Sequence, residues 1–272
     1  MNIIFAETEK GLRNENQDNF AVISQDDCNI QSVIICDGNG PSGKIMAEAA
    51  VRTGAGEILC AISKKRNKRI SLSEIREIGL NAISKAGEHI CLIKASDSKH
   101  LGSGSTITVV MISGNAVFCW WVGDSPALLF TEGKMIKLTD PPHTLAEELI
   151  AKGNSRESVM RQEELSSIIT RCLGYEESRP DFRFRRLKSN YCILVSSDGT
   201  RCLPDDCIKE IVESGFFSRD IPVRVINAAL AFGSDDNVTA VSIGGIIRRT
   251  GLMNLRRSYW KRRIGNDNIQ MA

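Results

Sequence analysis

The chain has 272 residues, of which 42% are hydrophobic, and its 35 basic and 33 acidic side chains leave a formal net charge of +2. This length allows a large buried core, and a charge so close to balance does not indicate a nucleic-acid partner. No apolar run reaches the roughly 18 residues of a membrane-spanning helix, and the first residues lack the basic start of a secretory signal, so we expect a cytoplasmic protein.

Six short apolar runs in the first half of the chain have the length and the turn-forming boundaries of strands. They lie at 19–24, 32–36, 105–112, 115–122, 126–130 and 135–138. Between the second and third runs, apolar residues at helical spacing predict a helix over 43–62. The basic run at 64–69 is typical of a solvated loop. Ser71 and Glu74 form a capping box that begins a second helix, which ends near residue 95.

The second half of the chain is less regular, and residues 139–190 show no clear period. A buried strand is predicted at 191–197, and a last strand at 237–245. Between them, two helices are predicted to begin at Pro204 and Asp220. Antiparallel strands with separate helix pairs indicate an α+β protein.

Four aspartates lie beside glycine or asparagine at the edges of the predicted strands. Asp37, Asp124 and Asp198 follow their apolar runs, whereas Asp236 precedes its run. If the strand after Asp236 is antiparallel to the others, all four carboxylates reach the same rim of the sheet. Carboxylates so placed repel one another unless cations neutralise them, which favours a site for Mg²⁺ or Mn²⁺, with Arg13 as a ligand for phosphate oxygens. For each aspartate taken singly, an ordinary turn is the alternative.

Eight short segments, each uninformative alone, form a pattern when they are taken in order. They are Arg13–Asp18, Asp37–Gly40, Gly104–Thr106, Val122–Ser125, Leu138–Asp140, Ile169–Gly174, Ser197–Gly199 and Asp236–Thr239. Together they resemble the metal-dependent serine/threonine phosphatases of the protein phosphatase 2C type, particularly the compact bacterial members. The resemblance covers about residues 1–245, which we expect to form one catalytic domain. It implies a four-layer αββα sandwich of two mainly antiparallel β-sheets flanked by helix pairs, with a binuclear metal centre at one end.

The resemblance also implies a set of metal ligands. Asp37 looks like the carboxylate that bridges two Mn²⁺ or Mg²⁺ ions, and the carbonyl of Gly38 would bind one of them. Asp198 and Asp236 look like ligands of the other ion. Asp124, together with Asp198, resembles the site of a third ion in bacterial relatives.

Catalytic roles fall by resemblance on Arg13, Asp18 and Asp37. Asp18 would orient metal-bound water, and Arg13 lies where the family binds the substrate phosphate. The implied reaction is attack of a metal-bridging water on phosphoserine or phosphothreonine, without a phosphoenzyme. A phosphorylated protein substrate, an opposing serine/threonine kinase and a monomeric state are the expectations that follow.

Three positions depart from the family pattern and leave a second interpretation open. Asn39 stands where many relatives have a histidine proposed as general acid, Gln17 replaces an acidic residue, and Pro126 replaces an arginine. Asparagine cannot donate a proton at a useful pKa. The alternative is therefore a catalytically weak or inactive pseudophosphatase that binds phosphoproteins as a regulatory module, although the retained Asp37, Asp198 and Asp236 favour the enzyme.

The family pattern ends near residue 245. Residues 246–272 contain seven Lys and Arg side chains and one acid, Asp267. This segment is predicted to be a basic tail, either frayed or packed on the domain, and the other interpretation is docking to an acidic partner or a membrane surface.

Overall fold

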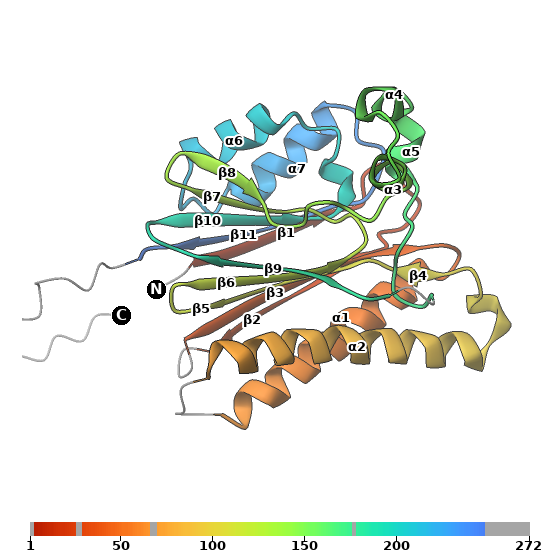
Figure 1. The fold of residues 1–272 in the computed structure, drawn as a ribbon, viewed down its shortest axis with the longest axis horizontal. Helices are drawn as coiled ribbons and strands as arrows, with labels where there is room; N and C mark the ends of the chain where they lie inside the picture. The colour runs from red at the N-terminus through yellow and green to blue at the C-terminus, as the bar shows by residue number, and fades with distance from the viewer. Residues whose placement is uncertain (1–2, 26–28, 66–69, 176–177, 248–272) are drawn as a thin grey trace, which may run out of the picture.

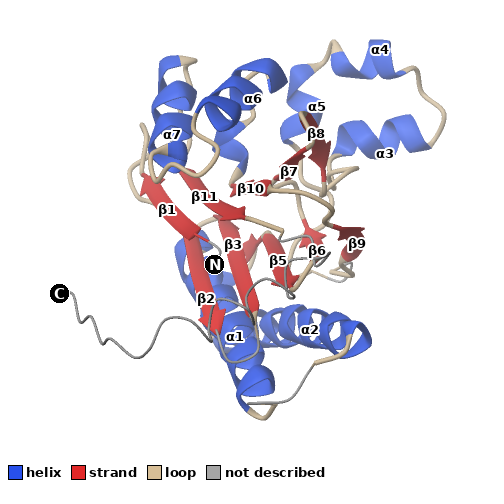
Figure 2. Ribbon diagram, turned by 90° about the vertical axis from the view of Figure 1, so that its left-hand side faces the viewer, coloured by secondary structure: helices blue, strands red, loops and turns tan. Residues whose placement is uncertain are grey.

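The fold is a stack of two β-sheets with helices on both outer faces (Figures 1 and 2). The computed structural model describes residues 3–25, 29–65, 70–175 and 178–247. Helices α1 (Gly43–Ser63) and α2 (Leu72–Ser96) cover the lower sheet of Figure 1. Helices α6 (Asp205–Ser214) and α7 (Ile221–Ala231) cover the upper sheet. The predicted α+β sandwich with four layers is confirmed.

The upper sheet has five strands, and all its neighbouring strands are antiparallel. In spatial order they are β1 (Ile3–Glu9), β11 (Val238–Gly245), β10 (Tyr191–Ser196), β7 (Ala127–Thr131) and β8 (Lys134–Lys137). The first and last strands in sequence are therefore neighbours. On its other side β11 pairs with β10, and because this pair is antiparallel the start of β11 lies beside the end of β10.

The lower sheet is also antiparallel throughout. Its order is β2 (Asp18–Gln25), β3 (Ile30–Asn39), β5 (Ile107–Ser113), β6 (Ala116–Val122) and β9 (Asp181–Arg186), and the short β4 (Gly104–Ser105) pairs with the end of β3. Three short helices follow β8 along the chain. They are α3 (Leu145–Ala151), α4 (Arg156–Met160) and α5 (Glu163–Ser167).

Strand β3 shows why the central strands are apolar on both faces. Val33 and Ile35 pack between the two sheets, whereas Ile34 and Cys36 pack against α1 and α2. Since side chains alternate between the faces of a strand, a strand with a core on each side must be apolar at every position. A third apolar cluster lies between the upper sheet and α6 and α7.

The predicted capping box is present at the start of α2. The Ser71 side chain accepts a hydrogen bond from the Glu74 N–H at 3.2 Å, and Glu74 accepts one from the Ser71 N–H at 2.8 Å. The two side chains thus satisfy backbone donors that the first turn of a helix leaves unpaired.

Gly79 allows α2 to lie directly on the lower sheet. A Cβ atom at this position would come within 2.5 Å of the buried Trp120 ring. We expect Gly79→Ala to lower the free energy of unfolding by about 1–3 kcal/mol, because overpacking outweighs the better helix propensity of alanine. Urea denaturation measures this change. Gly56→Ala in α1 is the matched control, because nothing lies within 4 Å of its Cβ position, and it should stabilise the protein.

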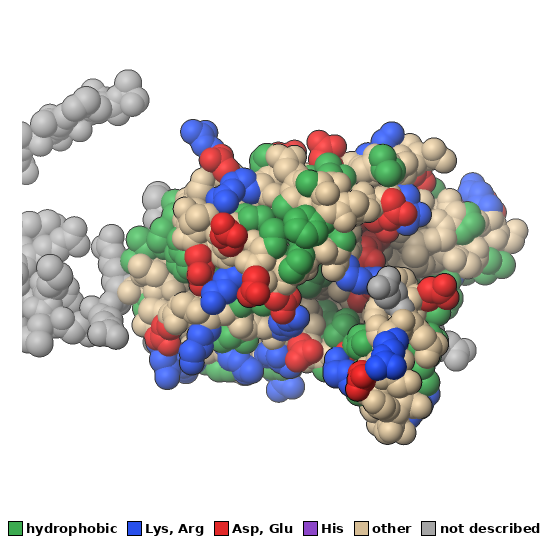
Figure 3. Space-filling model, turned by 90° about the horizontal axis from the view of Figure 1, so that it is seen from above, with side chains coloured by type: hydrophobic (Ala, Val, Ile, Leu, Met, Phe, Trp, Pro, Cys, Tyr) green, Lys and Arg blue, Asp and Glu red, His purple; other side chains and the backbone are tan. Residues whose placement is uncertain are grey.

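The surface over α6 and α7 mixes charged side chains with a cluster of apolar ones (Figure 3). Val223, Leu230 and Phe232, which belong to α7 and its C-terminal end, are among the exposed hydrophobic residues. No helix in the described part of the chain is both long enough and apolar enough to span a bilayer.

Most predicted elements are present within a few residues of their expected ends. Three strands, β1, β4 and β9, and the three helices α3–α5 were not predicted. The helix expected to begin at Pro204 begins one residue later, with Pro204 as its N-cap. Residues 66–69 of the basic loop predicted at 64–69, and residues 248–272 of the tail predicted at 246–272, lie outside the described residues.

Candidate functional site

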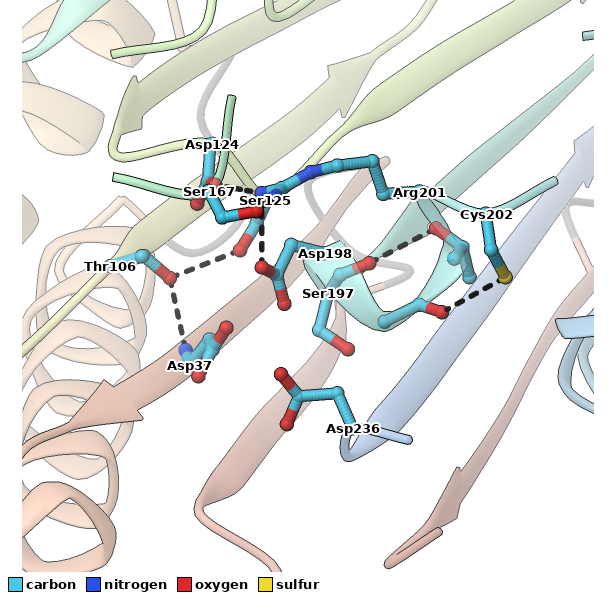
Figure 4. A network of polar contacts seen from close by, with 12 residues as sticks. Asp37, Thr106, Asp124, Ser125, Ser167, Ser197, Asp198, Arg201, Cys202 and Asp236 are labelled. Atoms are coloured by element: carbon cyan, nitrogen blue, oxygen red, sulfur yellow. Dashed lines mark hydrogen bonds and ion pairs between the residues drawn. The ribbon is translucent and has the colours of Figure 1, made fainter. Parts of the chain in front are cut away.

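The predicted aspartates meet at one end of the sandwich, but they come from both sheets and not from the rim of one. Asp37 lies near the end of β3 and Asp124 follows β6, both in the lower sheet. Asp198 follows β10 and Asp236 precedes β11 in the upper sheet. Because β10 and β11 are antiparallel, the end of one and the start of the other lie together. Figure 4 shows the four side chains around a common space.

Asp18 connects the two sheets at this end. It begins β2 directly opposite Asp37 on β3. Its Oδ2 accepts hydrogen bonds from the hydroxyls of Ser197 and Thr239, both at 2.7 Å, which belong to the upper sheet. Two hydroxyl donors on one oxygen fix the orientation of the carboxylate. Asp18 thus links the two sheets through Oδ2, and its Oδ1 has no hydrogen-bond partner among the described residues.

The backbone around Asp37 and Gly38 is held by several hydrogen bonds. The Asp37 N–H donates to Thr106 Oγ1 at 3.0 Å, and the Asp37 carbonyl accepts from the Thr106 N–H at 2.8 Å. A Cβ on Gly38 would lie 2.1 Å from the carbonyl oxygen of Gly43 at the start of α1. Only glycine permits this close approach, so the segment presents Asp37 from a rigid frame.

Asp124 is aimed by a glycine and a buried histidine. Gly123 has a φ of +109°, and its N–H donates to His143 Nδ1 at 3.0 Å. Since Nδ1 accepts, the proton of the neutral ring is on Nε2, which donates to Asp181 Oδ2 at 3.1 Å. Burial lowers the pKa of His143. Its imidazole is fully buried and acts as a support for the β6 end.

Arg201 lies between two of the predicted metal ligands. Its Nη2 donates to Asp198 Oδ2 at 3.0 Å and also forms a short hydrogen bond with Asp124 Oδ2 (Figure 4). Its Nη1 donates to Ser167 Oγ at 3.1 Å, at the end of α5. The guanidinium therefore joins both sheets and the segment of short helices.

Arg13 also pairs with a predicted ligand. Its Nη2 donates to Asp236 Oδ2 at 2.9 Å, and its side chain is 54% exposed. Asn237, which is buried, holds the loop that carries Arg13: its Nδ2 donates to the carbonyls of Lys10 and Glu15, and its Oδ1 accepts from the Gln17 N–H. Arg13 is thus placed beside the acidic cluster and remains open to solvent.

Burial and the nearness of several acids disfavour the charged forms of the carboxylates in this cluster. Burial raises the pKa of Asp18 to about 7, and the charges of Asp198 and Asp236 add to this effect against the hydroxyl donors. Burial also raises the pKa of Asp124 to about 7, assisted by the charge of Asp198 and opposed by Arg201. The pKa of Asp37 is raised well above its usual range by burial and then by Asp198, with which it shares a hydrogen bond. Two carboxyls in such contact need either a proton or a cation between them.

The donor set suits a hard divalent ion. All the converging side chains offer oxygen, and the Oδ1 atoms of Asp18 and Asp124 are buried without a hydrogen-bond partner among the described residues. Within the same residues, no group of three or more His, Cys, Asp and Glu side chains closes on one point as a ready-made metal site. The Asp124 and Asp236 carboxylates are instead turned to Arg201 and Arg13. The converging oxygens are nevertheless the kind of donor that hard divalent ions bind. The residues therefore fit Mg²⁺ or Mn²⁺.

A cavity of about 370 Å³ opens beside the cluster. Asp124, Asp198 and Arg201 line one side of it, and residues of α3, α4 and α5 line another. Pro126, one of the departures from the family pattern, also faces this cavity. The unpredicted helices thus form part of the wall of the candidate site.

The other two departures lie close to the cluster without entering it. Gln17 Nε2 donates to Glu15 Oε1 at 2.8 Å, so it is engaged by the Arg13 loop. Asn39 pairs with Gly104 and hydrogen-bonds to Cys172.

Several residues that organise the site were not singled out from the sequence. Ser197, Asn237 and Thr239 lie within the segments that carry the resemblance, which was the signal that could have identified them. Arg201 stands three residues after Asp198, but nothing in the sequence indicates that its side chain reaches Asp124 in the other sheet.

Comparisons with known proteins identify the family to which this fold belongs. The family model of protein phosphatase 2C matches residues 51–238. The serine/threonine phosphatase stp of Listeria monocytogenes is 28% identical over 242 residues, which cover 87% of this chain and 93% of that protein. The solved serine/threonine phosphatase of S. agalactiae has a TM-score of 0.76 at 26% identity, over 89% of this chain and 99% of that one. The catalytic domain of the phosphatase PstP in complex with two manganese ions has a TM-score of 0.70 at 22% identity, over 89% and 97%. The chain belongs to the protein phosphatase 2C family of serine/threonine phosphatases.

Proposed function

We propose that this chain hydrolyses phosphoserine and phosphothreonine in proteins, that it depends on Mn²⁺ or Mg²⁺, and that it forms no phosphoenzyme. The observation that carries the proposal is the group of carboxylates brought together from both sheets, in which burial and the neighbouring acids raise the pKa values of Asp18, Asp37 and Asp124. The fold is shared with the PstP catalytic domain, whose structure was solved with two manganese ions.

The ions would be held by Asp37, the Gly38 carbonyl, Asp198 and Asp236, with Asp18 behind them. Bound ions of this kind activate water for attack on phosphorus and neutralise the charge that develops on the phosphoryl oxygens. The frame around Asp37 and Gly38 and the hydroxyls on Asp18 keep these oxygens in place before substrate arrives. This preorganisation is the main contribution that the chain's own residues make.

Arg13 is the candidate for binding the substrate phosphate. Its guanidinium is exposed at the rim of the cluster and is held by a single ion pair, with Asp236. An ion bound to Asp236 would weaken this ion pair. The Arg13 guanidinium would then be free to donate two parallel hydrogen bonds to phosphate oxygens.

The cysteines give no support to a covalent mechanism. Cys172, which hydrogen-bonds with Asn39, is buried, and burial raises the pKa of its thiol. A thiol with a raised pKa is a poor nucleophile at neutral pH. Direct hydrolysis by water remains the route that fits the site.

Arg13→Ala should lower kcat/KM for a phosphothreonine peptide by about 10- to 100-fold, because charge-assisted hydrogen bonds to phosphate contribute about 1.5–3 kcal/mol. Steady-state kinetics at saturating Mn²⁺ measures this loss, and Arg13→Lys should restore part of it. Arg52→Ala, which removes an exposed arginine from α1, is the matched control and should leave kcat/KM unchanged. An unaltered kcat/KM in Arg13→Ala would remove Arg13 from the phosphate site.

We propose that the enzyme acts as a monomer in the cytoplasm. Its substrate is a phosphoprotein, and a serine/threonine kinase opposes it. We also propose a catalytic domain at 1–245 and a basic tail at 246–272. Docking of the tail to an acidic partner or a membrane surface stays a prediction, since residues 248–272 lie outside the described part of the chain.

The alternative function is a pseudophosphatase that binds phosphoproteins without turnover. The ion pairs of Asp236 with Arg13 and of Asp124 with Arg201 favour it, because they engage two predicted ligands. Hydrolysis of an aryl phosphate and a phosphothreonine peptide, with and without Mn²⁺, separates the two functions. The enzyme predicts Mn²⁺-dependent turnover that Asp198→Ala abolishes, whereas the alternative predicts phosphopeptide binding and no turnover at saturating metal.

A further inference from the structure

Arg201 joins two acidic side chains that come from different sheets. Asp124 follows β6 in the lower sheet and Asp198 follows β10 in the upper sheet, and both Oδ2 atoms accept a hydrogen bond from Arg201 Nη2 (Figure 4). The Asp124 side chain is only 2% exposed, so its charge must be met from within the protein. Among the described residues, Arg201 is the only basic side chain that forms an ion pair with Asp124.

The position of Arg201 is fixed at both ends of the residue. Its backbone N–H donates to the Asp198 carbonyl at 2.7 Å, which anchors it to the 3₁₀ turn Asp198–Thr200. The other guanidinium nitrogen, Nη1, donates to Ser167 at 3.1 Å. A side chain held in this way is a built part of the site and not a loose surface arginine.

A guanidinium and a divalent ion cannot both use this pair of carboxylates. An ion that joined these two carboxylates would have to displace Arg201 Nη2 from both Oδ2 atoms, or bind Asp124 beside the positive guanidinium through Oδ1 alone, which has no hydrogen-bond partner among the described residues. Arg201 therefore provides, without metal, the positive charge that a cation between Asp124 and Asp198 would otherwise provide.

We propose that Arg201 takes the place of a third metal ion, so that this centre binds two divalent ions and excludes another between Asp124 and Asp198. This inference rests on the proposed metal centre at Asp37, Asp198 and Asp236. It replaces the expectation from sequence that Asp124 is a metal ligand. Asp124 instead holds the arginine, and the arginine ties the segment of α3–α5 to the metal centre through Ser167.

The test counts the Mn²⁺ ions that bind to the full chain, by isothermal titration calorimetry and by metal analysis after equilibrium dialysis. We expect two ions in the unaltered protein and one additional ion in Arg201→Ala. In the double variant Arg201→Ala/Asp124→Asn, the number should return to two, because the vacated site has lost its carboxylate. Arg201→Lys, which keeps a positive charge, should also bind two.

Arg161→Ala is the matched control, because it removes an exposed arginine whose ion pair with Glu157 lies away from the cluster, and it should bind two ions. Circular dichroism spectra verify that each variant is folded before its ions are counted. Three ions in the unaltered protein, or no gain in Arg201→Ala, would overturn the inference and leave the proposed phosphatase intact. No Mn²⁺ binding in any of the proteins would overturn the metal centre and the inference with it.

Discussion

Replacement of Asp37 by asparagine is expected to reduce the phosphatase activity by about 10³-fold or more and, at the same time, to stabilise the metal-free protein. Asp37 lies at the centre of the cluster, where Asp18 is directly opposite in register and Asp198 is within hydrogen-bonding distance. Asparagine keeps the shape of the side chain but removes the charge, so it holds a divalent ion poorly and loses the charge neutralisation on which phosphoryl transfer depends.

Activity falls but stability rises, because the charged Asp37 carboxylate destabilises the folded metal-free protein. Burial and the neighbouring acids raise the pKa of Asp37, which means that its charged form is disfavoured in the folded state. Removing this carboxyl should therefore raise the free energy of unfolding of the metal-free protein at pH 8. Added Mn²⁺ should stabilise the unaltered protein and have little effect on Asp37→Asn.

Thermal denaturation with and without Mn²⁺, together with turnover of an aryl phosphate, measures both effects. Asp206→Asn, at an exposed position in the first turn of α6, is the control: it should leave turnover unchanged and should lower stability slightly, because an acidic side chain there interacts favourably with the helix dipole. If Asp37→Asn lost stability as well as activity, the carboxylate would have a structural role and the argument from repulsion would be wrong.

The strands could be predicted where apolar runs were continuous, since a strand with a core on each side leaves no polar gap in the sequence. The edge strand β9 was missed because its apolar and charged residues alternate and do not form a continuous apolar run. Phe182 and Phe184 point to the aromatic side chains of β6, whereas the alternate residues are polar or charged. An alternating run rich in arginine resembles a loop unless the partner strand is known. Helices α3–α5, of five to seven residues, are too short to show a helical period.

The candidate site was predictable as a set of aspartates and not as an arrangement. Each aspartate is marked by a strand end, which is a local signal. Contacts between the sheets depend on how strands distant in the sequence are stacked. The bonds from Ser197 and Thr239 to Asp18 join residues about 200 positions apart, as their separations of 179 and 221 show. Arg201 was missed for the same reason, because its interaction with Asp124 spans 77 positions.

The metal-free protein should lose stability as the pH rises from 5.5 to 8.5, and Mn²⁺ should reverse this loss. Burial raises the pKa values of Asp18 and Asp124 from 3.8 to about 7, so between about pH 4 and pH 7 the folded protein binds more protons than the unfolded chain. The stability that these two carboxyls contribute is therefore fully present below their unfolded pKa of about 3.8. It falls as the pH rises and is lost above about pH 7. The expected loss is on the order of 3 kcal/mol, since one pKa unit corresponds to about 1.4 kcal/mol.

Urea denaturation in the presence of a chelator, repeated at saturating Mn²⁺, measures this dependence. The buried His143, whose pKa is lowered, acts in the opposite direction below about pH 6.5, so the informative quantity is the difference between the unaltered protein and Asp18→Asn. The asparagine oxygen can still accept hydrogen bonds from the hydroxyls of Ser197 and Thr239. The variant should therefore lose less stability at high pH than the unaltered protein. Because metal binding requires deprotonated carboxylates, Mn²⁺ should stabilise the unaltered protein most at pH 8.5. Equal pH profiles for the two proteins would mean that Asp18 is charged in the folded state without a cation, and the carboxylate cluster would then provide no driving force for metal binding.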